Sequence, residues 1–177
     1  MGKAENTEMM QFLTFKLDGE LFALNIAKVR EVLDITTVTR VPRTPEFMLG
    51  VINLRGSVVP VVDLRLRFGM RQGERTVNTC IVIAEVLVEG ETLVLGVMVD
   101  SVQEVIDLSP ADIEPAPKIG TRLDMEFIIG MGKLKEKFII ILNIDRLFSS
   151  DELAAVWSRA GGEAFMHTDT DSGFDMV

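Results

Sequence analysis

The sequence predicts a mainly β protein with few and short helices, and three observations support this. Its apolar runs are short and rich in β-branched residues, as in residues 58–62, which is typical of buried strands. Gly, Pro, Asn and Asp separate these runs at close intervals. A stretch of the first half also recurs in the second half, which indicates an internal repeat. We therefore expect two small β-barrels or sheets.

The repeat is visible as two alignments at consistent shifts. Residues 22–35 (FALNIAKVREVLDI) match residues 95–108 (LGVMVDSVQEVIDL) without a gap. Further on, residues 46–50 (EFMLG) match residues 126–130 (EFIIG), so a loop insertion must lie between the two matched segments. Aliphatic strands agree partly by chance, but the shared Glu-Val-aliphatic-Asp and Glu-Phe-x-x-Gly patterns are more specific. We expect a duplication, with a first repeat at about 12–79 and a second at about 80–150.

Eight strands follow from the apolar runs and the turn residues between them. They are expected at residues 10–17, 21–24, 29–35, 58–64, 80–87, 93–99, 102–108 and 138–144. Leu17-Asp-Gly-Glu20 and Val88-Glu-Gly-Glu91 are hairpin signals that precede the matched segments. Pro60 cannot donate a ladder hydrogen bond, so its strand should lie at an edge or carry a bulge.

Helix is expected in two places. Pro45 and Gly50 suit the start and the end of one helical turn. Ser149 and Glu152 form a capping-box pattern before a helix at about 150–160, in which Leu153, Val156 and Trp157 share one face. Residues 161–177 have no periodicity, and we expect a disordered tail after a single domain at 1–160.

Composition and charge argue against several classes of function. The net charge of −9 argues against nucleic acid, because no cluster of Lys and Arg is available to neutralise phosphates. Apolar runs stay well below the roughly 18 residues of a membrane span, and the first residues carry no hydrophobic signal region. The single cysteine, Cys80, permits no internal disulfide. We expect a cytoplasmic protein without direct membrane insertion.

Residues suited to catalysis are scarce, so we expect no enzyme, no cofactor and no metal site. His167 is the only histidine and lies in the tail, and Cys80 begins an apolar run typical of a buried strand. Asp63, Asp100 and Asp145 each interrupt or end a strand, where capping is the usual role of a carboxylate. The competing interpretation is an acid/base enzyme, and it requires two of these three aspartates to face one site.

Two polar residues, Glu31 and Arg55, are set among aliphatic neighbours. An arginine in such surroundings must be paired or must point into an interface. The two residues either form an intramolecular bridge or orient a partner at a recognition surface. These interpretations are compatible, because a structural pair can shape a surface.

Two valine pairs, Val29/Val32 and Val102/Val105, occupy equivalent positions in the two repeats. A spacing of three places the members of a pair on opposite faces of a regular strand, unless the chain bends there. Either these valines are core residues, or they line an apolar groove between the repeats that suits an amphipathic helix.

Five motifs stand out along the chain: Ile26-x-x-Val29-x-Glu31-Val32, Gly50-Val-Ile-Asn-Leu-Arg-Gly56, Pro60-Val-Val-Asp-Leu-Arg65, Gly96-Val-Met-Val-Asp100-x-Val102 and Pro115-Ala-Pro117. With these motifs, about residues 11–160 resemble the CheW-type coupling proteins of bacterial chemotaxis. The resemblance implies a pair of SH3-like five-stranded barrels that share a hydrophobic core, without enzymatic activity. The tail matches no part of the family pattern.

The resemblance also implies partners: the regulatory domain of the histidine kinase CheA and the cytoplasmic tips of methyl-accepting chemoreceptors. The receptor-facing residues would be Ile26, Val29, Glu31, Val32, Val102 and Val105, with Arg55 close by. The kinase-facing loops would be those around Val41, Arg43, Glu114 and Ile119. The protein would then be associated with the inner membrane through receptor arrays. A scaffold of the same fold in a non-flagellar pathway (twitching or second-messenger control) and self-association into rings stay open.

Overall fold

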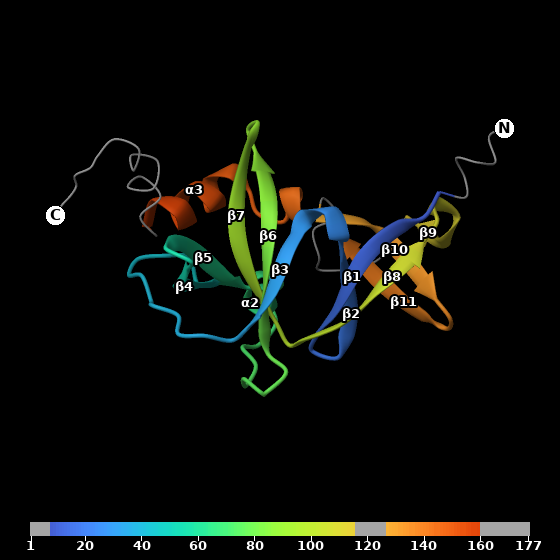
Figure 1. The fold of residues 1–177 in the computed structure, drawn as a ribbon, viewed down its shortest axis with the longest axis horizontal. Coiled ribbons are helices and arrows are strands. Elements are labelled where there is room, and N and C mark those ends of the chain that lie inside the picture. Colours follow the sequence, from blue (N-terminus) through green and yellow to red (C-terminus); the bar gives the residue numbers. More distant parts are fainter. Residues whose placement is uncertain (1–7, 116–126, 160–177) are drawn as a thin grey trace.

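The computed structural model describes residues 8–115 and 127–159, which form two β-sheets with short helices (Figure 1). The strands are β1 (Met10–Leu17), β2 (Glu20–Asn25), β3 (Val29–Asp34), β4 (Met48–Leu54), β5 (Ser57–Asp63), β6 (Cys80–Val88), β7 (Glu91–Val99), β8 (Ser101–Leu108), β9 (Ile113–Glu114), β10 (Ile128–Leu134) and β11 (Lys137–Leu142). The helical segments are η1 (Ile26–Lys28), α2 (Leu64–Arg67), η2 (Pro110–Asp112), η4 (Ile144–Arg146) and α3 (Ser150–Arg159). The expected mainly β class is confirmed.

The two sheets have the same strand order once repeat-equivalent strands are matched. Sheet A runs β8-β1-β2-β11-β10-β9 and sheet B runs β3-β6-β7-β5-β4. In the repeat, β1 to β5 correspond in order to β6, β7, β8, β10 and β11. Replacing each strand of sheet B by its equivalent gives β8-β1-β2-β11-β10, which is sheet A without the two-residue β9. The parallel pairs are also equivalent, since β2 joins β11 and β7 joins β5.

Each sheet contains strands from both halves of the chain. The β1–β2 hairpin of the first half lies in sheet A, between β8 and β11 of the second half. The β6–β7 hairpin of the second half lies in sheet B, between β3 and β5 of the first half. The two halves have therefore exchanged hairpins, and neither sheet is made of one repeat alone.

Beyond each edge strand, the chain crosses to the opposite edge of the same sheet. After β3, Thr39 pairs with Val51 of β4, and after β8 the short strand β9 pairs with β10. Glycine makes both approaches possible, because a Cβ at Gly50 would clash with the Thr39 carbonyl oxygen. A Cβ at Gly130 would likewise lie 2.7 Å from the Glu114 carbonyl oxygen.

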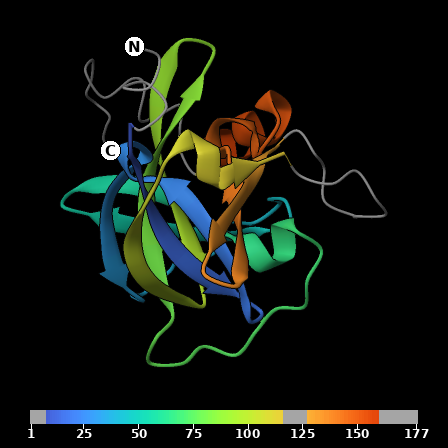
Figure 2. The ribbon, with the colours of Figure 1, turned by 90° about the vertical axis from the view of Figure 1, so that its right-hand side faces the viewer.

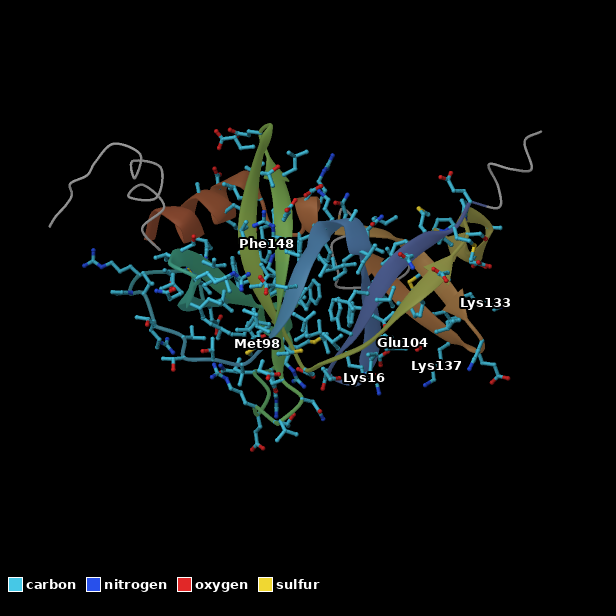
Figure 3. The ribbon with its side chains drawn as sticks, viewed as in Figure 1. Lys16, Met98, Glu104, Lys133, Lys137 and Phe148 are labelled. Carbon is cyan, nitrogen blue, oxygen red and sulfur yellow. The ribbon has the colours of Figure 1, made fainter. Side chains whose placement is uncertain are left out.

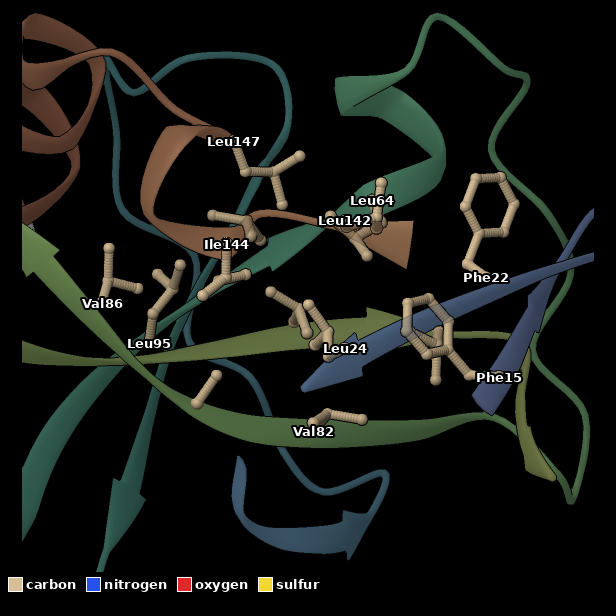
Figure 4. Packing of buried hydrophobic residues seen from close by; sticks show 14 of the residues in the cluster. Phe15, Phe22, Leu24, Leu64, Val82, Val86, Leu95, Leu142, Ile144 and Leu147 are labelled. Carbon is tan, nitrogen blue, oxygen red and sulfur yellow. The ribbon is translucent and has the colours of Figure 1, made fainter. Parts of the chain in front are cut away.

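The largest apolar cluster lies between the sheets and takes residues from both (Figure 4). Phe15, Phe22 and Leu24 of sheet A meet Val82 and Leu95 of sheet B in this shared core. Two smaller clusters lie on the other faces, one around Phe12 and Ile139 in sheet A and one around Ile81 and Ile83 in sheet B. Burying apolar surface from both sheets in one cluster holds the two units together.

Local signals read from the sequence are largely confirmed. Tight turns at Asp18-Gly19 and Glu89-Gly90 close the two exchanged hairpins, and all four turn residues have positive φ. The Ser149 hydroxyl accepts a hydrogen bond from the Glu152 backbone N–H at 3.0 Å, while the Glu152 carboxylate accepts one from Ser149 N–H at 2.8 Å. The capping box therefore starts α3 as expected.

Two local expectations are wrong. Residues 44–50 do not form a helical turn, because Met48 N–H bonds to the Pro45 carbonyl in a tight turn and β4 starts at once. Pro60 does not lie on an edge strand, because β5 is flanked by β7 and β4. The parallel pairing of β5 with β7 begins only at Val61, so the missing N–H of Pro60 interrupts no ladder. A bulge opposite Val61 and Val62 does occur, on the partner strand β4.

Substitution of Gly50 by alanine should destabilise the fold strongly. The new Cβ would meet the Thr39 carbonyl where the chain closes on β4, and Gly50 has a φ of +148°. We expect a loss of about 3 kcal/mol in the free energy of unfolding, measured by urea denaturation. Gly56→Ala is the matched control, because its φ is +90° but no atom lies within 4 Å of a new Cβ. A loss of about 1 kcal/mol is expected there, and equal losses at both sites would contradict the account.

Candidate interaction site

β-Bulges in β3 and β8 determine toward which face the side chains of the two valine pairs point. Both strands are edge strands, β3 of sheet B and β8 of sheet A. In each strand the register against its neighbour shifts by one residue between the two valines of a pair. One extra residue reverses the alternation of the side chains that follow it.

In β3 the bulge places both valines on the face of the shared core. Val29 pairs with Ala84 and Val32 pairs with Val82, and directly paired residues point to the same face of a sheet. Ala84 and Val82 both belong to the cluster between the sheets. The chain therefore bends as the valine spacing requires if both members of a pair are to share a face.

The equivalent bulge in β8 has the same result. Val102 pairs with Phe15 and Val105 pairs with Leu13, which are both members of the shared core. The Thr14 hydroxyl completes the irregular ladder, because it donates to the Glu104 carbonyl at 2.7 Å and accepts from Glu104 N–H at 3.1 Å. A buried side chain thus satisfies the backbone groups that the bulge displaces.

We call the four valines on these two edges, together with Ile26 of the helical turn η1 just before β3, the apolar strip: Ile26, Val29, Val32, Val102 and Val105. Ile26, Val29 and Val102 pack against the shared core and are half-buried. Val32 and Val105 are exposed, with 41% and 47% of their surface accessible. The strip therefore has a rigid base in the core and two valines open to solvent.

Glu31 and Arg55 lie apart from the strip, on the other face of β3. Glu31 pairs with Ile83, which belongs to the separate cluster of sheet B. Its carboxylate forms an ion pair with the Arg55 guanidinium, which comes from the turn between β4 and β5. Of the two interpretations that the sequence left open, the intramolecular bridge is present. The Arg55 side chain is still 69% exposed, so it also remains accessible to a partner.

Three of the four residues expected at the kinase lie in the segments that follow the edge strands β3 and β8. We call these segments, 35–47 and 109–115, the closing segments. Val41 is half-buried, and its carbonyl accepts a hydrogen bond from the Thr44 hydroxyl at 3.0 Å. Arg43 is exposed and has a φ of +61°. Glu114 is exposed on the short edge strand β9. Ile119 lies outside the described residues.

The three aspartates that carried the enzyme interpretation have structural partners. Asp63 is buried and accepts a hydrogen bond from Arg65 N–H at the start of α2. Asp145 accepts from Leu87 N–H and binds the Lys28 ammonium at 2.8 Å. The Asp100 carboxylate is bound by two guanidinium nitrogens of Arg65, at 2.7 and 2.8 Å.

The environments of two of these carboxyls shift their pKa values in opposite directions. Burial raises the pKa of Asp63, although N–H hydrogen bonds oppose the effect, and its second carboxyl oxygen has no hydrogen-bond partner among the described residues. Burial also acts to raise the pKa of Asp100. There the hydrogen bonds from Arg65 and from Asp18 N–H outweigh it, so the pKa is below its usual value.

Residues 8–115 and 127–159 contain no further group suited to metal binding or nucleophilic chemistry. No group of three or more His, Cys, Asp and Glu in that part of the chain could hold a metal ion. Cys80 is buried at the start of β6, and burial raises the pKa of its thiol, so it packs as a small apolar residue. None of the helices in those residues is long and apolar enough to cross a membrane.

Comparison with known proteins identifies the family. Residues 11–152 match the CheW-like domain. The chain belongs to the CheW family. It is 39% identical to the chemotaxis protein CheW of Klebsiella aerogenes over 153 residues, which is 86% of this chain and 90% of that protein. The chemotaxis protein CheW of Rhizobium meliloti is 35% identical over 82% of this chain and 91% of its own length.

A solved structure agrees with the fold. The scaffolding protein TtCheW of Thermoanaerobacter tengcongensis superposes with a TM-score of 0.73 at 37% identity, over 82% of this chain and 91% of that one. The mainly β class with two sheets, of six and five strands, is thus confirmed. CheW proteins are non-catalytic chemotaxis scaffolds, so the chain is an adaptor and not an acid/base enzyme.

Substitution of Asp100 by asparagine should reduce stability in a pH-dependent way. The folded-state pKa of Asp100 lies below the unfolded value of about 3.8, so ionisation stabilises the fold above that pH and the contribution is lost as pH falls through the folded pKa. We expect Asp100→Asn to lower the free energy of unfolding by about 2 kcal/mol near pH 7, with the difference shrinking below pH 3.8. Urea titrations across this range measure it, and Asp107→Asn on the exposed side of β8 is the control. A deficit that did not change with pH would contradict the account.

Proposed function

We propose that this protein couples methyl-accepting chemoreceptors to a CheA-type histidine kinase. The observation that carries the proposal is the apolar strip, in which bulges turn the edge valines of both repeats toward one core. Membership of the CheW family supplies the class of partner. The protein would then work in the cytoplasm, held at the inner membrane by receptor arrays.

The proposed ligand of the strip is the cytoplasmic tip of a chemoreceptor, because this tip is a helical hairpin. A helix presents apolar residues at intervals of three and four, which suits side chains on two strand edges that pack against one core. Val32 and Val105 are the accessible contacts, while Val29 and Val102 hold the strip against the core. Arg55, held by Glu31, would supply a charged contact at one side of the recognition surface.

The kinase would bind at the closing segments of the sheets, through Val41, Arg43 and Glu114. The tight turn at Thr44 and the positive φ of Arg43 give this segment a defined shape before binding. Preorganised segments lose less conformational entropy on association. Each interface would be modest, and many copies in an array would strengthen the assembly by multivalency.

A charged residue at the exposed end of the strip should abolish receptor binding without unfolding the protein. Val32→Asp and Val105→Asp are the preferred variants, because Val29 and Val102 pack on the core and a charge there would also cost stability. We expect at least a tenfold loss of affinity for a receptor hairpin, measured by calorimetry. Val77→Asp is the control, since Val77 is 96% exposed in the segment between α2 and β6. Normal binding by both strip variants would refute the assignment.

Removal of the Arg43 guanidinium should weaken kinase binding and leave receptor binding intact. Arg43→Asn is suitable because asparagine tolerates the positive φ of this residue. We expect a several-fold loss of affinity for the kinase regulatory domain by calorimetry, together with weaker receptor-dependent stimulation of the kinase. An equal loss of affinity for both partners would show a general structural effect instead.

A further inference from the structure

The ion pairs between the two halves of the chain all have the same polarity. Within residues 8–115 and 127–159, four ion pairs join a residue before position 80 to a residue after it. In each, the first half supplies the cation and the second half the anion. The pairs are Lys28–Asp145 at 2.8 Å, Arg30–Glu85 at 2.7 Å, Arg65–Asp100 at 2.7 Å and Arg67–Glu152 at 3.4 Å.

Two of these pairs occupy equivalent places in the repeats with the charges reversed. Arg65 follows the cap of α2, and Asp145 holds the equivalent position after the cap of η4. Arg65 binds Asp100, which lies where the chain crosses from sheet B to sheet A. Asp145 binds Lys28, which lies where the chain crosses from sheet A to sheet B. The geometry is repeated, and the sign is inverted.

Because the charges of the equivalent ion pairs are reversed, electrostatic repulsion disfavours the pairing of two first halves or of two second halves. If two first halves met in this geometry, Arg65 of one would approach Lys28 of the other. If two second halves met, Asp145 would approach Asp100. Like charges that face each other in an interface select against the wrong partner.

The net charges of the two halves also favour the pairing of a first half with a second half. The first 79 residues hold 11 Lys and Arg against 9 Asp and Glu, which is a net charge of +2. The following 98 residues hold 7 against 18, which is a net charge of −11. Lys133 and Lys137 of the second half flank the tip of the β10–β11 hairpin, at the outer end of sheet A (Figure 3), and neither forms one of these ion pairs.

The connection between the halves does not itself enforce their pairing. The chain between α2 and β6 passes around the outside of the molecule (Figure 2), and residues 74–78 are exposed. A long exposed connection and exchanged hairpins are the conditions under which an identical element can be supplied by a second copy. Whichever chain supplies it, the element must carry complementary charges.

We propose that the two halves form a self-selective pairing surface, which accepts the complementary half of the same chain or of a second copy and rejects a like half. Two copies can then form a dimer by exchange, in which each sheet has the same strand order as in the monomer. Its contacts are those of the monomer, so the two forms differ in connection and not in interface.

The test uses the full chain with a site-specific protease sequence inserted between Glu74 and Arg75, both exposed. Unlabelled and nitrogen-15-labelled proteins are cut, unfolded in urea, mixed in equal amounts and refolded, and native mass spectrometry identifies the complexes. We expect the four combinations of one first half with one second half in similar amounts. Complexes of two like halves, or halves that stay apart after refolding, would overturn the proposal.

A charge-reversal variant tests whether the polarity of the ion pairs causes the selective pairing of the halves. Lys28→Glu in the cut protein should compete about tenfold less well than the wild-type first half for a limiting amount of second half, because it would face Asp145. Arg55→Glu is the matched control, since the ion pair of Arg55 lies within the first half and its loss should leave the competition even. Equal competition by Lys28→Glu would show that apolar contacts alone select the partner, which also overturns the proposal.

Discussion

The exchange of hairpins between the two halves is the constraint on which the rest of the structure depends. Because β1–β2 completes sheet A and β6–β7 completes sheet B, the shared core cannot form until both halves are present. Phe15 and Phe22 from one half meet Val82 and Leu95 from the other in that core. The edge strands, the closing segments and α3 are all positioned by this arrangement, so the proposed interaction surfaces depend on the whole chain and not on either repeat.

Much of the fold could be predicted because strands that are buried carry a strong local signal. The β-branched runs located eight of the strands to within one or two residues at each end. Three strands were not predicted. Strand β9 has only two residues, and Gly50 and Gly130 interrupt the apolar pattern of β4 and β10. At those glycines a neighbouring segment of the chain passes so close to the backbone that a Cβ would clash with it. Such a contact joins distant parts of the chain, and single-sequence periodicity carries no information about it.

For the proposed site, the sequence indicated one bend of the backbone but not how all of the side chains are placed. The spacing of Val29 and Val32 showed that a bend was needed if both were to share a face, and the bulge supplies it. The sequence did not separate Glu31 from these valines, although the structure places it on the opposite face. The ion pairs between the halves were also missed. Their signal was the opposite charge of Arg65 and Asp145 at equivalent positions of the repeat.

The bulges have a further consequence for the kind of contact that the edges of the sheets permit. An edge strand exposes a row of N–H and C=O groups to which any extended peptide could add. In β3 and β8 the extra residue breaks the regular spacing of that row beside the exposed Val32 and Val105. A continuous ladder with an incoming strand is therefore disfavoured where apolar side chains would otherwise attract one. The apolar side chains of the proposed site can therefore stay exposed with a reduced risk of aggregation through the sheet edges.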